Sequence, residues 1–487
     1  MVVILLFNSS AFLCFFPMVT AFFWVIPRKF RKLWLLFSSF VFVLSESIYS
    51  CKVLILVSGL SFLFGIILDR TEGKKKKIVF YISIIACLMP LIILKYQNFL
   101  PFLIKKDNDP LKSNSLVTPI GISFYTLQAI GYLIDVYKKE GKAVYNIADY
   151  ALYLSFFPKF LSGPLVCEQD FFEQTRKIVN GKFNETKMKS GAILMMWGYF
   201  LKIILADNLS VLVTRIYDFG DAYSGTVILV GTFLFAIQLY ADFAGYSYIA
   251  IGASQILGYR LKNNFRQPYF ATSIKDFWRR WHISLSLWLR KYIYIPLGGN
   301  RAGRYQKYKN ILITFFVSGL WHGASWNFVA WGMLHGLYQI LEDCLKNVEK
   351  KYLILRGKKK IISEIIQRIC VIILVVFAWI FFRASGLKTA LRMLIKVITD
   401  MDFRNFFDGT FLMLGLSGYE LIILTISVIV LFAVDILHEK NKSIQIWLNR
   451  KSRLFRWCCY LITLFILFIA AVRRFGSEAS GFIYSQF

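Results

Sequence analysis

The sequence predicts an all-α polytopic membrane protein, and three properties of the 487-residue chain indicate this fold class. Hydrophobic residues make up 57% of the chain and only 18% of residues are charged, against roughly 25% in a soluble domain. The mean hydropathy is +0.56, and the apolar residues gather in long uninterrupted runs. At roughly 20 residues for each spanning helix, the chain accommodates about eleven spans. These properties exclude a water-soluble enzyme, a secreted disulfide-linked domain and a disordered chain.

The charge of the chain has a topological explanation. Lysine and arginine number 58 against 28 acidic residues, which gives a formal net charge of +30. In a soluble protein this excess would suggest a nucleic-acid ligand. Here the basic residues lie in short clusters between apolar runs, as the orientation of membrane helices by positive cytoplasmic loops requires. We therefore expect membrane lipids as neighbours and no nucleic-acid partner.

The apolar runs predict the spans in chain order. The first run, residues 2–26, is followed by its basic cluster, whereas a secretory signal peptide carries its positive charge before the apolar run. We expect a retained first helix with its N-terminus outside. The basic clusters also place the C-terminus outside, in a multi-pass protein of the plasma membrane. The further runs cover residues 33–50, 52–69, 78–100, 116–137, 190–205, 225–257, 311–341, 361–382, 419–437 and 457–472.

Residues 164–310 do not divide into clean helices. Apolar stretches, several too short to span, alternate there with proline, glycine and charge. In a bilayer such backbone is tolerated only where protein or a water-filled cavity surrounds it. We therefore expect re-entrant segments in this region and the active site among them, within a single membrane-embedded domain of residues 1–487. The sequence contains no visible internal repeat, which disfavours an inverted-repeat transporter.

Three of the four histidines lie in or near this irregular region. A histidine at membrane depth is costly unless it is partnered, so His282, His322 and His335 are functional candidates, with a hydrogen-bonded structural role as the alternative for each. Trp321 and Gly323 flank His322, and an indole-rich wall would keep its imidazole neutral and able to accept a proton. On one straight helix His335 would face another side, so we expect a packing role for it.

Other polar residues suggest binding, whereas the sequence lacks several common catalytic motifs. Ser286 lies one turn after His282 and could help it bind a polar group. Asp242 is an isolated carboxylate that could orient a histidine or arginine, or satisfy a helix end. No HExxH, Walker A or GxSxG motif occurs, and the eight cysteines form no CxxC pair, so we expect no metal site. Four basic residues beside a Gly-Gly-Asn segment could neutralise the phosphates of a donor or act as interfacial anchors: Arg290, Lys291, Arg301 and Arg304.

Three consecutive segments resemble the membrane-bound O-acyltransferases (MBOAT), and most closely their bacterial alginate O-acetylation branch. These segments are QLYADFAGYSYIAIG, NNFRQPYFATSIKDFWRRWHISLSLWLRKYIYIPLGGNR and GLWHGASWNFVAWGMLHG. The resemblance covers about residues 119–336, and the ordered combination of WHISLS, LGGNR and GLWHG is highly specific. The sister branch that transfers D-alanine to lipoteichoic acid usually lacks LGGNR. The presence of this segment therefore favours acetyl transfer.

The resemblance implies an enzyme in which a cytoplasmic acyl thioester meets an extracytoplasmic hydroxyl through a central tunnel. The family's invariant catalytic histidine falls on His322 and its second histidine on His282. His322 would act as the base, and Trp321, Asn327 and protonated His282 are candidate oxyanion donors. The terminal FIYSQF resembles an aromatic family motif whose tyrosine, Tyr484 here, is proposed to relay the acyl group. A tail that only packs is the alternative.

The expected function is that of a membrane O-acyltransferase without a bound cofactor. It would move an acyl group, preferably acetyl from acetyl-CoA, to hydroxyls of a cell-envelope polysaccharide, with an extracytoplasmic SGNH-type acyltransferase or esterase as partner. One alternative is D-alanyl transfer from an acyl carrier protein thioester to teichoic acid. The other alternative is a non-enzymatic transporter or flippase.

Overall fold

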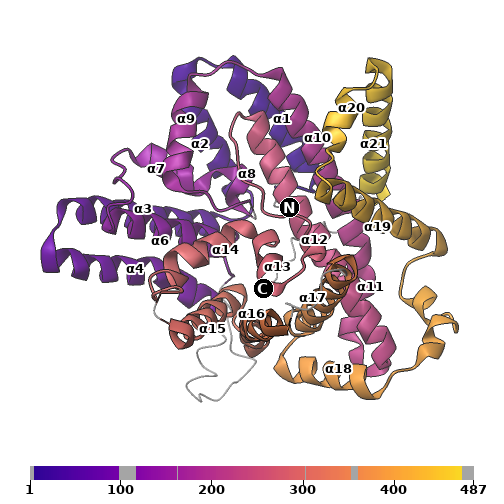
Figure 1. Cartoon of the computed structure of the whole chain (residues 1–487). Helices are drawn as coiled ribbons and strands as arrows, with labels where there is room; N and C mark the ends of the chain where they lie inside the picture. The colour runs from indigo at the N-terminus through magenta and orange to yellow at the C-terminus, as the bar shows by residue number, and fades with distance from the viewer. Residues whose placement is uncertain (1–4, 98–116, 162, 302, 353–359, 474–487) are drawn as a thin grey trace. The chain divides into compact units, whose positions relative to one another are not determined.

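The computed structural model describes residues 5–97, 117–161, 163–301, 303–352 and 360–473, and Figure 1 shows its course. Every regular element in these ranges is a helix, which confirms the all-α fold class. Internal contacts divide the chain into two compact units. The first comprises residues up to 197 and residues 246–263, and the second comprises residues 198–245 and the chain from residue 264 onward. The predicted single domain therefore stays a prediction.

The first unit is built mainly from the N-terminal helices. Its helices α3, α4 and α6 pack against one another, and α2 packs against α7. Small residues bring α10 and the end of α12 into backbone contact, since a Cβ on Gly252 would lie 2.5 Å from the carbonyl oxygen of Gly191. The helices are α1 (Ser10–Val25), α2 (Arg28–Leu44), α3 (Ile48–Arg70), α4 (Gly73–Lys95), α6 (Ile122–Tyr137), α7 (Ile147–Ser155), α8 (Phe157–Phe160), α9 (Glu168–Val179), most of α10 (Glu185–Tyr199) and the end of α12 (Gly225–Ile256).

The second unit holds the irregular central region and the C-terminal helices (Figure 1). Within it, α13 packs against α16, and the π-helical turn η4 packs against α15. Its elements are η1 (Phe200–Ala206), α11 (Asp207–Asp218), η2 (Gly220–Ala222), most of α12, η3 (Pro268–Phe270), α13 (Ile274–Arg280), α14 (Ile283–Leu289), η4 (Arg290–Tyr294), α15 (Gly303–His322), α16 (Trp326–Tyr352), α17 (Lys360–Arg383), α18 (Leu387–Thr399), η6 (Phe403–Phe406), η7 (Thr410–Met413), α19 (Gly418–Glu439), α20 (Ile444–Asn449) and α21 (Arg453–Arg473).

Seven helical stretches in the described residues are long and apolar enough to cross a membrane, which agrees with a multi-pass membrane protein. One of them, Glu185–Asp218, is continuous and contains the π-helical segment η1. Three further predicted runs are the shorter helices α1, α2 and α6. The spanning stretches are Ile48–Arg70, Gly73–Lys95, Glu185–Asp218, Gly225–Ile256, Ile362–Arg383, Gly418–Glu439 and Arg453–Val472.

The predicted apolar run 311–341 is not one span, and this corrects the sequence-based expectation. The chain leaves the helix after His322 and starts a new one at Trp326, so α15 and α16 form a helical hairpin. Glycines let the two helices touch: a Cβ on Gly319 would lie 2.4 Å from the carbonyl oxygen of Phe328. The apolar periodicity of the sequence continues through the turn, which is why composition alone does not reveal it.

The irregular region predicted between the long helices is present. Four short helical elements, η3, α13, α14 and η4, follow α12 within 38 residues of its end. Their backbone includes two non-glycine residues with positive φ, Gln267 and His282. Such short elements cannot span a bilayer, and they carry the residues of the candidate site. A continuous tunnel across the membrane stays a prediction.

Candidate active site

His322 is the last residue of α15, at the turn of the hairpin, and its side chain is only 3% exposed. Three aromatic rings pack on its imidazole. The ring centroid of Trp321 lies 4.8 Å away, that of Trp331 lies 4.8 Å away, and that of Phe382 from α17 lies 5.3 Å away. The predicted indole-rich wall is therefore present, although Trp331 and Phe382 come from other helices. Burial in such a wall favours the neutral imidazole, which can accept a proton.

His335 lies on α16 and is fully buried among aromatic rings. Its Nδ1 accepts a hydrogen bond of 3.3 Å from the indole Nε1 of Trp278. The ring centroid of Trp331 lies 5.1 Å from that of His335 and 4.8 Å from that of His322, so one indole contacts both imidazoles. The structure thus places His335 in a packed aromatic cluster.

His282 occupies the turn between α13 and α14, with φ 41° and ψ 55° in the left-handed region. Its ring is 1% exposed, and its Nδ1 lies 3.2 Å from the Oδ1 of Asn264. The ring of Phe243, from α12, stands edge-on to it at 4.6 Å. Burial lowers the pKa of His282 to about 3, so the imidazole is neutral at pH 7. This result does not support the predicted protonated form as an oxyanion donor.

Trp321 connects the two candidate histidines. Its ring centroid lies 6.0 Å from His282 and 4.8 Å from His322, and the side chain is 7% exposed. Although the two histidines are 40 positions apart in the sequence, the turn before α14 and the end of α15 bring both rings to the same indole. The structure therefore assembles three of the predicted site residues at one place.

A cavity of about 910 Å³ lies in the same unit, between the α13–η4 segment and the α15–α16 hairpin. Its wall changes in character from exposed cations to buried groups. Ser318 is 1% exposed and lies one helical turn before His322 on α15, so the cavity reaches close to the catalytic candidate. The segment 297–301, LGGNR, contributes four of its five residues to the wall. Among the lining residues the buried ones are Trp278, Leu289, Gly299, Ile311 and Ser318.

The cavity separates the four predicted basic residues into two pairs. Arg290 and Arg301 line it, together with the predicted Ser286. Lys291 and Arg304 are not among its lining residues: the Lys291 ammonium lies 4.9 Å from the ring centroid of Tyr292, and Arg304 donates a 2.6 Å hydrogen bond to the hydroxyl of Tyr308. The charged residues of the wall are Lys275, Arg279, Arg290, Arg301, Lys307, Glu342 and Asp343.

Asn327, a predicted oxyanion donor, bonds to backbone carbonyl groups. Its amide nitrogen donates to the carbonyl oxygens of Phe381 at 3.1 Å and Ala384 at 3.0 Å. These two bonds use both amide hydrogens, so none is left for an oxyanion. Asn327 instead joins the start of α16 to the end of α17, which places Phe382 against His322. Tyr484, the predicted relay residue, lies outside the described residues.

Asp242 pairs with a lysine rather than with a histidine or arginine. The Lys202 ammonium lies 2.6 Å from Asp242 and 2.8 Å from Asp207, and all three side chains are at most 4% exposed. Lys202 belongs to the π-helical segment η1, and Asp242 lies on α12 next to Phe243, which touches His282. The ionic triad therefore joins η1 to α12, the helix that packs Phe243 against His282.

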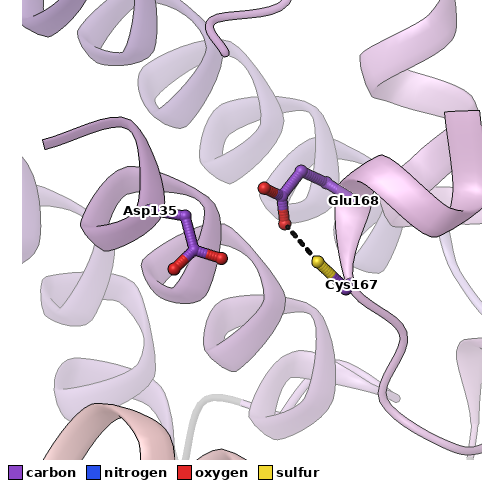
Figure 2. A group of neighbouring side chains, drawn as sticks. All are labelled: Asp135, Cys167 and Glu168. Atoms are coloured by element: carbon purple, nitrogen blue, oxygen red, sulfur yellow. Dashed lines mark hydrogen bonds between the residues drawn. The ribbon is translucent and has the colours of Figure 1, made fainter. Parts of the chain in front are cut away.

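A second cluster lies in the first unit and consists of Asp135, Cys167 and Glu168. Their ligand atoms lie within 4.8 Å of one another. The Cys167 Sγ lies 3.5 Å from Oε2 of Glu168, and Figure 2 shows the thiol directed toward this carboxylate. Burial and the adjacent Glu168 carboxylate raise the pKa of this thiol to about 11, so it is protonated. The expected absence of a metal stays a prediction.

Sequence reasoning missed several residues of the site. Asn264 contacts His282 across 18 positions, and Trp331 and Phe382 form the wall around His322. Lys202 lies within the predicted apolar run 190–205. A charged residue inside such a run is itself a signal of function or of buried pairing, and this signal would have identified Lys202.

Comparison with known proteins identifies the family of the chain. The model of the membrane-bound O-acyltransferase family matches residues 136–383, a range that includes His282, His322 and the cavity. The chain belongs to this family and is a membrane O-acyltransferase.

Among its relatives is the probable alginate O-acetylase AlgI of Azotobacter vinelandii. That protein is 33% identical over 399 residues, which cover 80% of this chain and 77% of the relative. The peptidoglycan O-acetyltransferase of Helicobacter pylori is 31% identical over 430 residues, covering 81% and 80%. The teichoic acid D-alanyltransferase of Streptococcus thermophilus is 26% identical over 298 residues, covering 59% and 69%.

Proposed function

We propose that this enzyme transfers an acetyl group from acetyl-CoA to hydroxyls of a cell-envelope polysaccharide. The observation that carries the proposal is the cavity that is lined both by exposed cations and by the buried Ser318, one helical turn before His322 on α15. The names of the relatives that it matches over most of their length, an alginate O-acetylase and a peptidoglycan O-acetyltransferase, support acetyl as the acyl group and a polysaccharide as the acceptor.

The cavity has the size and charge that a nucleotide-bearing thioester needs. Its volume of about 910 Å³ falls within the range of roughly 300–1,000 Å³ for small-molecule sites. Five cations and two carboxylates line it, and one carboxylate, Asp343, is already paired with Lys307 at 2.7 Å. The exposed Arg290 and Arg301 would hold the phosphates by charge-assisted hydrogen bonds. The buried apolar wall around Trp278 would receive the thioester end.

In the proposed reaction His322 acts as the general base. An acceptor hydroxyl oxygen attacks the thioester carbonyl carbon, while the imidazole of His322 takes the hydroxyl proton. The new C–O bond forms a tetrahedral oxyanion, the C–S bond then breaks, and the thiolate recovers the proton from the imidazolium. Trp321, whose indole lies against both histidines, is the candidate oxyanion donor. The dry aromatic wall strengthens each of these interactions.

The proposed location follows the charge distribution of the chain. Positive loops on the cytoplasmic side of the plasma membrane would place both termini outside, with acetyl-CoA entering from the cytoplasm. The polysaccharide would be reached through an extracytoplasmic SGNH-type partner. Tyr484 would carry the acetyl group toward that partner as a phenyl ester. In this scheme Tyr484→Phe removes only one oxygen, and it should abolish polysaccharide acetylation.

D-alanyl transfer is the competing chemistry, and one structural feature favours acetyl transfer over it. The LGGNR segment, which the resemblance associates with the acetylating branch, forms part of the cavity wall through Gly298, Gly299, Asn300 and Arg301. The relative named as a teichoic acid D-alanyltransferase also matches a smaller share of this chain, 59%. Membership of an acyltransferase family argues against the transporter alternative.

A single assay distinguishes the donors. Membranes that contain the enzyme would be incubated either with radiolabelled acetyl-CoA or with a D-alanyl carrier protein thioester, and label in envelope polymers would be counted. We expect label from acetyl-CoA alone, and its loss in membranes with His322→Gln at equal protein amount. Incorporation from the carrier thioester alone would refute acetyl transfer, and equal incorporation by the variant would refute the assignment of His322.

A further inference from the structure

Asn264 lies in the connection between α12 and α13 and is 1% exposed. Its side-chain oxygen accepts hydrogen bonds from the backbone nitrogen of Ser284 at 3.1 Å and from the hydroxyl of Ser284 at 3.0 Å. Because a backbone N–H can only donate, the atom that faces it must be the amide oxygen. The orientation of the Asn264 amide is therefore fixed by the main chain, independently of His282.

The same oxygen lies 3.2 Å from Nδ1 of His282. An amide oxygen can only accept, so the ring nitrogen that faces it must carry the hydrogen. In a neutral imidazole one nitrogen holds the hydrogen and the other holds the lone pair. We propose that Asn264 is a positioning residue that keeps the hydrogen of neutral His282 on Nδ1, so that Nε2 presents its lone pair to the reacting groups.

This inference rests on the proposed function, and it specifies that His282 accepts rather than donates a hydrogen bond at the reacting groups. A lone pair at Nε2 accepts a hydrogen bond, so it suits a group that carries a hydrogen, such as the acceptor hydroxyl or an amide of the donor. It repels an oxyanion. His282 would then accept a hydrogen bond from the reacting groups, and Trp321 would donate one to the oxyanion, since the indole N–H can only donate.

Asn264 also holds the backbone that presents the ring. His282 has a positive φ, which is a strained conformation for a non-glycine residue. The carbonyl oxygen of Asn264 accepts a 2.9 Å bond from the backbone nitrogen of Ile283, next to this position. One residue thus anchors the strained turn through its main chain and sets the tautomer through its side chain. Strain of this kind persists only where the surroundings over-determine it.

The first test reads the tautomer directly and does not depend on activity. The chain has four histidines, so isotope-labelled histidine in lipid nanodiscs gives few NMR signals, and His282→Gln identifies the signal of interest. We expect the wild-type ring to be neutral with its hydrogen on Nδ1. A hydrogen on Nε2 would overturn the proposal even if the acetylation assay succeeds. An Nδ1–H signal would support it even if the donor proves to be another thioester.

The second test uses the acyl-transfer rate with Asn264→Asp, which keeps the oxygen acceptor and adds a negative charge. An adjacent carboxylate raises the pKa of His282. The ring then becomes protonated on Nε2 at a higher pH and loses its lone pair, so the acid limb of the rate profile should move to higher pH. A residue that merely holds the turn would give a profile that coincides with the wild type, and that outcome would overturn the proposal.

Asn264→Leu removes the acceptor, and Asn263→Leu provides the matched control because it makes the same change at an exposed neighbouring position. We expect Asn264→Leu to lower kcat on the order of 10²-fold with little change in KM, and Asn263→Leu to leave both unchanged. If Asn264→Leu fails to fold, the wild-type NMR signal and the pH–rate profile of Asn264→Asp still test the proposal. Equal kcat in the two leucine variants would count against the proposal.

Discussion

The imidazole of His322 stands edge-on to the indole of Trp331, with the ring centroids 4.8 Å apart and the ring planes at 87°. The same indole also packs against His335, which lies on the same helix, with the two ring centroids 5.1 Å apart. Trp331 is fully buried, so its ring has no freedom to move away from either histidine. Two histidines that look alike in the sequence therefore differ in what surrounds them: His322 lies near the cavity end, and His335 lies in the aromatic packing.

The first prediction concerns His322→Gln, which replaces the imidazole by a polar side chain of similar volume that cannot act as a base. We expect the acyl-transfer rate to fall on the order of 10²–10⁴-fold, because general base catalysis is lost. The amount of folded protein, measured by fluorescence-detected size exclusion, should be unchanged. If protein amount falls in step with activity, the histidine is structural.

His335 should behave in the opposite way. His335→Ala removes the acceptor for the Trp278 indole and leaves a void, so we expect a loss of stability of about 2–4 kcal/mol. His335→Asn places an amide oxygen where Nδ1 accepts, and it should recover part of that loss. Thermal unfolding in detergent measures the stability, and the rate per folded molecule should stay within a few-fold of the wild type. A rate loss as large as that of His322→Gln would contradict this ranking.

Charge reversal at the cavity tests the donor site. Arg290→Glu combined with Arg301→Glu should raise the KM for acetyl-CoA by roughly one to two orders of magnitude, with a smaller effect on kcat, because bonds to charged groups contribute about 1.5–3 kcal/mol. Lys291→Glu combined with Arg304→Glu is the matched control, since neither residue lines the cavity. Steady-state kinetics at two salt concentrations would measure both. Equal shifts in the two double variants would show that general surface charge, rather than the cavity, determines donor affinity.

Composition and hydropathy were sufficient to predict the all-α membrane fold, because each long helix must be apolar to cross the bilayer. The resemblance selected His282 and His322, and the structure places both rings against Trp321. The break between α15 and α16 escaped prediction because Gly323–Ser325 interrupt the helix without interrupting its apolar composition. Turn geometry of this kind depends on the packing of Gly319 against Phe328, a contact that has no signature in local sequence.

The polar partners of the site were harder to predict than the site itself. Asp242 was expected to meet a histidine or arginine, but its partner Lys202 lies 40 positions away on another helix. Asn327 looked like a donor to substrate because it follows the histidine motif, yet α17 uses both of its amide hydrogens. Pairings between distant helices depend on tertiary packing, which the spacing of residues within one helix does not determine.

Close packing within the hairpin gives the fourth prediction. A Cβ on Gly332 would lie 2.3 Å from the carbonyl oxygen of Phe315, a backbone atom that cannot move aside, whereas a Cβ on Gly336 would lie 3.2 Å from the flexible end of Leu312. We expect Gly332→Ala to separate α15 from α16 and to lower both stability and acyl transfer. Gly336→Ala should be tolerated. Thermal unfolding and rate would be compared for both variants, and similar behaviour would show that the helices do not need this contact.

The last prediction concerns the buried ionic triad of Lys202, Asp207 and Asp242. One ammonium serves two carboxylates, so the three positions are not equivalent. Asp242→Asn removes one negative charge and leaves the pair of Lys202 with Asp207 intact, so we expect only a modest loss of stability. Lys202→Met removes the shared cation and leaves two buried carboxylates close together. Removal of one partner of a buried pair typically costs about 3–5 kcal/mol, and here the same change also adds repulsion between like charges. We therefore expect Lys202→Met to reduce the yield of folded protein sharply.

The double variant Lys202→Met with Asp242→Asn should recover part of the loss, because it removes one of the two charges. Yield and thermal unfolding of the three variants measure this order. If Asp242→Asn lowers yield and stability as much as Lys202→Met, the Asp242 carboxylate has a role beyond neutralising the lysine. The triad would then do more than hold in place the helix that carries Phe243.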